Sequence, residues 1–157
     1  MARRGEISAG LLAYRRRPAL QFLLAHPGGP FWAKKDDGAW TIPKGLIGHD
    51  DLLDGARREF EEETGFVAKG PFTPLKPVRQ KSGKTVHAFA FEAEFDPAAF
   101  VSNTFEMEWP PKSGKKAAFP EVDRAAWFGL DEARRRIQPG QVPILEELVH
   151  RLVAARP

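Results

Sequence analysis

The sequence predicts an α/β protein in which a mixed β-sheet lies between helices. Short apolar segments with strand-like composition occur on both sides of one acidic amphipathic helix, which begins at Asp50 or Asp51 and ends at Gly65. A second amphipathic helix closes the chain at residues 142–155. Strands before and after a helix, followed by a further helix, are typical of a sheet that helices cover.

The first two predicted strands are residues 7–14, interrupted by Gly10, and residues 19–25. The arginines between them form a hairpin connection that ends at Pro18. Residues 26–38 are a loop rich in Pro and Gly, and residues 40–42 are predicted as a short strand that leads to Lys44. Loops held by a scaffold often carry function.

Trp32, Lys34 and Lys35 in the loop give it two open interpretations. An aromatic ring beside two lysines can hold a base and its phosphates, but the same residues also suit an ordinary exposed connection. Lys44 has the same two interpretations, as a phosphate contact or as a solvated residue. His49 is either an acid or base close to the carboxylates described next or a polar surface residue.

The acidic helix is defined by its ends and by its apolar stripe. Asp50 or Asp51 caps its start, Asp54 adds a negative charge in the first turn, and Gly65 follows its last residue. Apolar side chains recur at spacings of three and four residues, which places them on one face. They are Leu52, Leu53, Ala56 and Phe60.

Another face of this helix concentrates negative charge. Glu59, Glu62 and Glu63 lie within one turn of each other, and like charges at this spacing destabilise a helix by roughly a few tenths of a kcal/mol per pair. A solvated acidic face is one interpretation. The other interpretation is a binding site for a divalent cation, because Mg²⁺ and Ca²⁺ prefer carboxylate oxygens.

The second half of the chain predicts more strands and two helices. Residues 74–80 and 84–95 form a hairpin around Ser82 and Gly83, and residues 103–109 alternate like a strand. Residues 110–119 are predicted as a lysine-containing loop, and residues 124–128 as the last strand. Residues 130–137 form a short helix before the closing one, where Pro143 lies in the first turn.

Composition places the chain among globular proteins and excludes several kinds of site. At 157 residues, with 42% hydrophobic and 29% charged residues, it has the size and balance of one domain. It contains no cysteine, which excludes disulfides, zinc–thiolate centres and cysteine nucleophiles. The net charge of +3 suits anionic substrates but is too small to indicate nucleic acid. No apolar run is long enough to span a membrane, so we expect a cytoplasmic protein.

Residues 43–66 resemble the Nudix box, whose pattern is Gly, five residues, Glu, seven residues, then Arg-Glu-apolar-x-Glu-Glu-x-Gly-apolar. Its second half matches at Arg58, Glu59, Phe60, Glu62, Glu63, Gly65 and Phe66. Gly45 supplies the opening glycine. The first half departs from the pattern, because the segment between Gly45 and Arg58 is one residue short and Asp50 replaces the glutamate.

The resemblance implies a Nudix-type α/β/α sandwich with a mixed central sheet, formed by residues 1–157 as a single domain. It implies Mg²⁺ or Mn²⁺ held by Glu59, Glu62, Glu63 and the carbonyl of Gly45. Glu59 would be the first choice for the catalytic base, and Arg58 would orient the carboxylates. Family members often add a late glutamate, for which the candidates are Glu106, Glu108 and Glu121.

The function implied is that of a metal-dependent pyrophosphohydrolase acting on a nucleoside diphosphate linked to another group. Residues 30–45 and 105–111 are similar to bacterial members of the diadenosine tetraphosphate hydrolase-like group, which favours a dinucleoside polyphosphate or a nucleoside triphosphate. The alternative is a non-catalytic nucleotide-binding module, favoured by the shortened loop and Asp50. We expect a nucleotide-derived small molecule as partner, with Trp32, Lys34 and Lys44 as substrate contacts, and neither a membrane nor a stable nucleic-acid partner.

Overall fold

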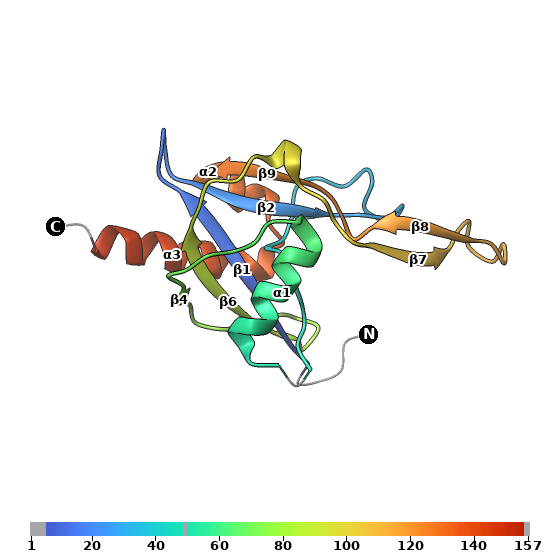
Figure 1. The fold of residues 1–157 in the computed structure, drawn as a ribbon, viewed down its shortest axis with the longest axis horizontal. Helices are drawn as coiled ribbons and strands as arrows, with labels where there is room; N and C mark the ends of the chain where they lie inside the picture. The colour runs from blue at the N-terminus through green and yellow to red at the C-terminus, as the bar shows by residue number, and fades with distance from the viewer. Residues whose placement is uncertain (1–5, 49, 156–157) are drawn as a thin grey trace.

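The computed structural model describes residues 6–48 and 50–155 (Figure 1). Its main element is a seven-stranded sheet with the order β4-β6-β1-β2-β9, in which β3 also pairs with β1 and β5 with β6. The strands are β1 (Ile7–Arg15), β2 (Gln21–Pro27), β3 (Lys44–Leu46), β4 (Thr73–Pro74), β5 (Val78–Arg79), β6 (Thr85–Glu92) and β9 (Val122–Gly129). β1 and β6 are parallel and the other pairs are antiparallel, which confirms the predicted mixed sheet.

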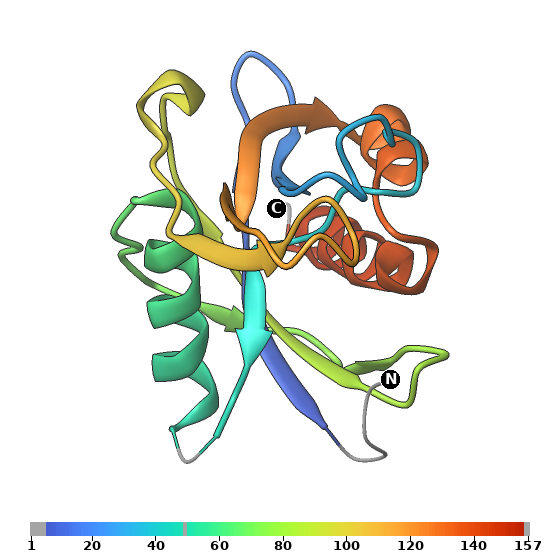
Figure 2. The same cartoon turned by 90° about the vertical axis from the view of Figure 1, so that its right-hand side faces the viewer.

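Helices cover both faces of this sheet. α1 (Leu52–Thr64) lies on one face, and α2 (Leu130–Arg136) and α3 (Val142–Ala154) lie on the other (Figures 1 and 2). Successive β1 residues enter different cores: Leu11 packs in the cluster that contains Phe60 of α1, and Leu12 in the cluster that contains Leu148 of α3. A strand covered on both sides needs apolar residues on both faces, as β1 has.

The boundaries of α1 follow from local chemistry. The Asp51 carboxylate accepts hydrogen bonds from the N–H groups of Leu53 and Asp54, so Asp51 rather than Asp50 caps the helix. Gly65 adopts a left-handed conformation with φ of 79° and donates its N–H to the carbonyl of Glu61. The helix thus begins and ends where the sequence predicted.

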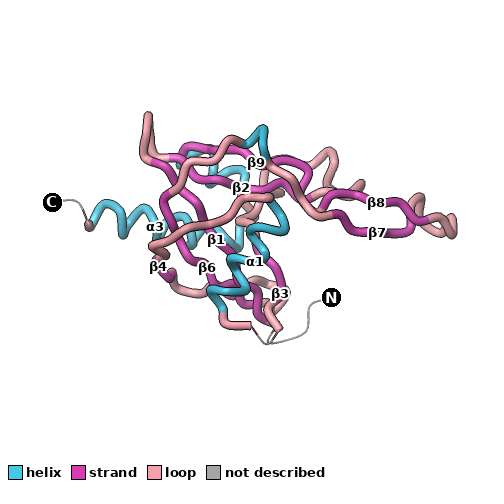
Figure 3. Tube along the Cα trace, in the orientation of Figure 1, coloured by secondary structure: helices cyan, strands magenta, loops and turns pink. Residues whose placement is uncertain are grey.

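A two-stranded antiparallel sheet extends away from the main sheet (Figures 1 and 3). It consists of β7 (Thr104–Glu108) and β8 (Lys116–Pro120). The prediction of a loop throughout residues 110–119 is therefore wrong in its second half. The lysines of residues 110–119 favour an exposed loop. Pairing with β7, however, places Ala117 opposite Met107 and Phe119 opposite Phe105, so one face of the hairpin is apolar.

Two other strand predictions change in detail. Residues 40–42 make only single bridges, at Trp40 and Thr41, and the paired strand is β3 immediately after them. The predicted arm 74–80 is split into β4 and β5, with Pro77 between them, which has no N–H to donate to a ladder. Two short 3₁₀ turns, η1 (Pro97–Ala99) and η2 (Pro139–Gln141), complete the described elements. No helix within the described ranges is long and apolar enough to cross a membrane.

Candidate functional site

The site is built where β3 pairs with β1, close to α1. β3 pairs with β1 so that Lys44 lies opposite Gly10 and Gly45 opposite Ala9. A Cβ atom at Gly10 would lie 2.6 Å from the Cβ of Lys44, so only glycine permits this approach. A Cβ atom at Gly45 would overlap the carboxylate of Glu59. The two glycines therefore bring the backbone of β3 against the acidic face of α1.

Glu63 is the most buried of the predicted carboxylates. Its residue exposure is 7%, and the charge and main-chain N–H of Lys44 favour its ionised form. Burial, and then the negative charges of Glu59 and Glu121, raise its pKa to about 8. A carboxyl group with this pKa is largely protonated at neutral pH in the metal-free protein.

Glu59 and Glu62 share one arginine. Arg58 contacts Glu59 at 3.3 Å and approaches Glu62 at 3.9 Å, and it also forms an ion pair with Asp50. Burial and the charge of Glu62 raise the pKa of Glu59, and Arg58 opposes this rise. Arg58 therefore lies where the sequence predicted, between the carboxylates, and Asp50 joins it from the segment that departs from the box pattern.

Among the three late glutamates, the structure brings only Glu121 to this cluster. Its N–H donates to the carbonyl of Asn103 at 2.8 Å, and the N–H of Asn103 donates to the carbonyl of Glu62 at 2.8 Å. This backbone chain ties the end of β8 to the end of α1. Burial and the negative charge of Glu62 raise the pKa of Glu121, and Glu121 in turn raises that of Glu63.

The other two late glutamates lie on the β7–β8 hairpin with different contacts. Glu106 is exposed on β7. Glu108 accepts hydrogen bonds from the N–H groups of Lys112 and Gly114, both at 3.0 Å, and so stabilises the tip of the hairpin.

The donor chemistry of the cluster suits a hard divalent cation. Glu59, Glu63 and Glu121 have pKa values raised by burial and by neighbouring negative charge, which a cation would relieve. In residues 6–48 and 50–155, no three Asp, Glu, His or Cys side chains already surround one point. Instead, Arg58 supplies the positive charge beside Glu59 and Glu62.

The predicted substrate contacts from the loop lie at another place. Lys34 is exposed, and Trp32 is covered by the ammonium group of Lys35, 5.1 Å from the ring centre. The loop follows the base of the β7–β8 hairpin, where Gly28 donates its N–H to the carbonyl of Glu121. It thus borders the main chain of Glu121, and none of the contacts described for it reaches the carboxylates of α1. His49, the other loop candidate, lies outside the described residues.

Gln141 supports the site, although the sequence analysis did not single it out. Its side chain is fully buried; Oε1 accepts from the N–H of Ile42 at 3.1 Å, and Nε2 donates to Thr41 Oγ1 at 2.8 Å. These bonds fix the segment that leads into Lys44 and Gly45. A glutamine two residues before Pro143 at a helix start resembles an ordinary polar cap, so no local pattern identified it.

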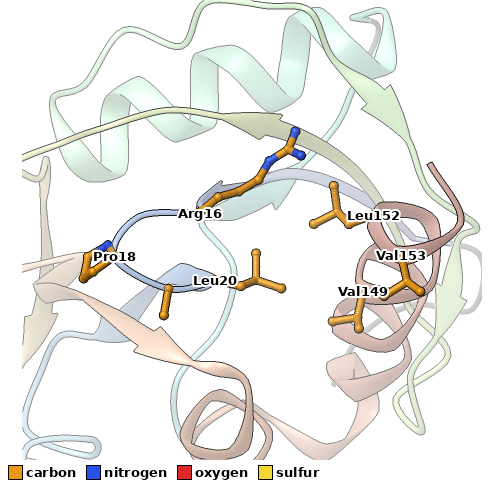
Figure 4. A pocket seen from close by; sticks show the side chains of 7 residues that line it. Arg16, Pro18, Leu20, Val149, Leu152 and Val153 are labelled. Carbon is orange, nitrogen blue, oxygen red and sulfur yellow. The ribbon is translucent and has the colours of Figure 1, made fainter. Parts of the chain in front are cut away.

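A separate hollow of about 340 Å³ lies between the β1–β2 turn and α3 (Figure 4). Leu20, Val149, Leu152 and Val153 make it mainly apolar, and Arg16 lies at its edge. It is located beyond the opposite end of β1 from the residues that pair with β3. It therefore takes no part in the carboxylate cluster.

Comparisons with known proteins identify the family to which the chain belongs. A family model described as NUDIX domain matches residues 6–148. An uncharacterized 17.7 kDa protein from the e-segB intergenic region of Enterobacteria phage T4 is 30% identical over 113 residues, which cover 69% of this chain and 74% of that protein.

Solved structures of low sequence identity share the fold. A C. elegans Ap4A hydrolase in a binary complex has a TM-score of 0.65 and 18% identity, covering 94% of this chain and 98% of that one. The NUDIX domain of Shewanella oneidensis NrtR, complexed with ADP ribose, has a TM-score of 0.66 and 16% identity, covering 97% and 90%. The MutT protein of Methanosarcina mazei has a TM-score of 0.63 and 18% identity, covering 97% and 98%.

Proposed function

The chain belongs to the Nudix family of hydrolases, enzymes that act on phosphoanhydride bonds, and on this premise we propose its reaction. We propose that it is a Mg²⁺- or Mn²⁺-dependent pyrophosphohydrolase that cleaves a nucleoside diphosphate linked to another group. The observation that carries this proposal is the mutual repulsion of Glu59, Glu63 and Glu121, whose pKa values are raised by burial and by neighbouring carboxylates, with the Glu59 side chain against Gly45. Such crowding is unfavourable in a protein that binds no cation there.

The ligands that we propose for the metal are the carboxylates of Glu59, Glu62 and Glu63, with the carbonyl of Gly45. Glu121 is the late carboxylate that joins them. When bound, a divalent cation neutralises phosphate charge and lowers the pKa of a water molecule. The protein's own contribution is to hold these oxygens where β3 packs against α1. Gly10 and Gly45 permit the close approach of β3 to β1 and to α1.

Arg58 has an orienting role in this proposal. Its contacts with Glu59, Glu62 and Asp50 restrict the side chains of all three. Asp50 takes part in the site through this ion pair. Although the loop before Asp50 is short, Arg58 can therefore still orient the carboxylates of the helix.

Glu59 is our first choice for the group that takes a proton from the attacking water, and Glu121 is the second. Both carboxyl groups have raised pKa values, which makes each a stronger base than an ordinary surface glutamate. The positive charge of Arg58 lowers the pKa of Glu59, whereas no arginine or lysine forms an ion pair with Glu121 within the described residues. Substituting each residue separately distinguishes the two.

For the substrate we propose a dinucleoside polyphosphate or a nucleoside triphosphate. Lys44, one residue before Gly45, provides a cation for a phosphate chain. Likeness to an Ap4A hydrolase fold supports this choice, whereas the NrtR domain, which was complexed with ADP ribose, makes ADP-ribose the necessary comparison.

The test is product release from diadenosine polyphosphates, nucleoside triphosphates, ADP-ribose and NADH, each with Mg²⁺, with Mn²⁺ and with EDTA. We expect turnover of one class that EDTA abolishes. Glu63→Gln should lose this turnover, and Glu106→Gln, which makes the same chemical change on the exposed hairpin, should keep it. Tight binding in calorimetry without turnover would instead support a nucleotide-binding module.

A further inference from the structure

His26 is a fully buried histidine near the end of β2, outside the carboxylate cluster. Its side chain has no exposed surface, and its ring packs edge-on against Trp40, with 5.1 Å between the ring centres. Its Nδ1 atom lies 2.9 Å from Oδ1 of Asp123 in β9, and its Nε2 atom lies 2.6 Å from the carbonyl oxygen of Lys35. Both ring nitrogens therefore face an oxygen atom.

Both of these oxygen atoms are hydrogen-bond acceptors. The carbonyl of Lys35 has no proton to donate. The Nε atom of Arg124 lies 3.5 Å from the same Oδ1 of Asp123, as it does beside a carboxylate anion. A neutral imidazole has one N–H and one lone pair, and here that lone pair would face an oxygen lone pair. The geometry is satisfied only when His26 carries a proton on both nitrogens, as an imidazolium ion.

The other charged groups near the ring have contacts of their own. Asp36, which follows Lys35, forms an ion pair with Arg136 of α2. The ammonium group of Lys35 lies over an indole ring of its own loop. Asp123 is thus the carboxylate that compensates the positive charge of His26.

The bond from His26 fixes the loop that follows β2. Within residues 29–37, all of which the structure describes, the carbonyl of Lys35 is the one main-chain group that bonds to another element. The remaining main-chain hydrogen bonds of this segment join residues of the loop itself. Just before it, Gly28 donates its N–H to the carbonyl of Glu121. The loop is therefore held by its main chain at two points, one beside Glu121 and the other at His26.

We propose that His26 is a positioning residue for the proposed reaction: as an imidazolium ion it fixes the loop through Lys35, so that Lys34 is held ready for the phosphates of the substrate. The inference rests on the proposed function, because it gives the loop a role in binding the same nucleotide. Its consequence is a pH-dependent substrate affinity. When the ring loses one proton, the other stays on the nitrogen that faces Asp123, because a carboxylate is the stronger acceptor. The bond to Lys35 is then lost and the loop is released.

The first experiment needs neither a variant nor turnover. NMR of the ¹⁵N-labelled protein in EDTA at neutral pH should show protons on both ring nitrogens of His26. As the pH is raised until the ring loses one proton, the proton on Nδ1 should remain and the amide signals of residues 30–35 should change together with the ring signals. The titration of His150, exposed on α3, is the control and should leave the loop signals unchanged. A single ring proton at neutral pH, or loop signals that do not follow His26, would overturn the inference.

Two substitutions separate the two bonds of the ring. The amide nitrogen of glutamine can occupy the place of Nε2, and that of asparagine the place of Nδ1, so His26→Gln keeps a donor for Lys35 and His26→Asn keeps one for Asp123. We expect His26→Asn to raise KM for a nucleoside triphosphate by about tenfold, as the loss of a charge-assisted bond does, and His26→Gln to restore most of the affinity. In both variants kcat should stay within about twofold of wild type, because the loop acts on binding. His150→Gln is the matched control and should change neither constant.

A pH profile distinguishes positioning from packing. The KM of the wild-type protein should rise over the pH range in which NMR shows that His26 loses its proton. The KM of His26→Gln, which has no ring to titrate, should not rise there, whereas any effect of the carboxylate cluster is common to both proteins. Parallel KM profiles for the two proteins would contradict the inference.

Turnover separates this inference from the proposed function. If no nucleotide is hydrolysed but calorimetry shows that a nucleoside triphosphate binds His26→Asn more weakly than His26→Gln, the proposed reaction is wrong and the positioning role is supported. If hydrolysis depends on the metal as proposed and the two variants have equal KM values, the reaction is supported and the positioning role is wrong.

Discussion

Replacing Glu63 by glutamine should make the metal-free protein more stable at pH 8 and inactivate the enzyme. Burial and the charges of Glu59 and Glu121 raise the pKa of Glu63 from an ordinary 4.5 to about 8. Between these two pH values the folded protein holds a proton that the unfolded chain releases. The free energy of unfolding therefore falls as the pH rises from about 4.5 to about 8.

The magnitude follows from the difference between the two pKa values of Glu63. A difference of one pKa unit corresponds to about 1.36 kcal/mol, so the full loss is at most about 5 kcal/mol. The glutamine side chain would be neutral at every pH, but its buried amide donors lack an assured partner, which costs roughly 1–3 kcal/mol. The expected net gain at pH 8 is about 2 kcal/mol, or roughly 4–8 °C in melting temperature for a chain of this size.

Thermal unfolding in EDTA from pH 5 to pH 8 measures this effect. The wild-type melting temperature should fall across that range, and that of Glu63→Gln should fall much less. Adding Mg²⁺ at pH 8 should raise the wild-type melting temperature more than that of the variant. Parallel pH profiles for the two proteins in EDTA would refute the reasoning, because the buried carboxyl group would then not be the source of the slope.

Three further substitutions test the rest of the site. Gly45→Ala should displace the carboxylate of Glu59 and reduce kcat by about tenfold or more, with a melting temperature within a few degrees of wild type, because the overlapping group is the end of a flexible side chain; a large loss of stability would show that the backbone moves instead. Glu121→Gln should reduce turnover and weaken Mg²⁺ binding, whereas Glu106→Gln should do neither, and equal effects would contradict the selection of the late carboxylate. Gln141→Leu should lower the free energy of unfolding by roughly 2–4 kcal/mol, since it leaves buried backbone and hydroxyl groups unpaired; a chemical denaturation midpoint equal to wild type would contradict this.

The helix α1 could be predicted closely because its determinants are local. The cap at Asp51, the left-handed glycine at Gly65 and the stripe that buries Ala56 and Phe60 are all specified within one short segment of the chain. The mixed sheet could also be predicted in outline, because the apolar runs that form β1 and β6 do not depend on which strand pairs with which. The site residues on α1 are therefore those whose relative placement needed no tertiary information.

The remaining parts of the fold and site depend on contacts between distant segments. Glu121 differs from Glu106 and Glu108 only through the backbone bonds that join it to Asn103, and through Asn103 to the end of α1. Strand pairing lies at Lys44 rather than at residues 40–42 because Gly10 allows close approach there. Residues 116–120 become a strand because β7 supplies the opposing apolar face. None of these selections is encoded at a single position.

The orientation of β3 explains why acidic and basic groups can be concentrated so close together. Adjacent residues of a strand face opposite sides, so Gly45 opens toward the carboxylate of Glu59 in α1 while the side chain of Lys44 leaves β3 on the other face, over Gly10. None of the ion pairs within residues 6–48 and 50–155 joins Glu63 to the side chain of Lys44, and the charge of each only partly offsets the effect of burial on the other. A direct pair would satisfy both charges internally and leave neither for a ligand. By separating them across one strand, the fold leaves the Glu63 carboxyl group and the Lys44 ammonium group without an ion-pair partner among the described residues. An added cation and an added polyanion are complementary to these two sides, so we expect each ligand to strengthen the binding of the other.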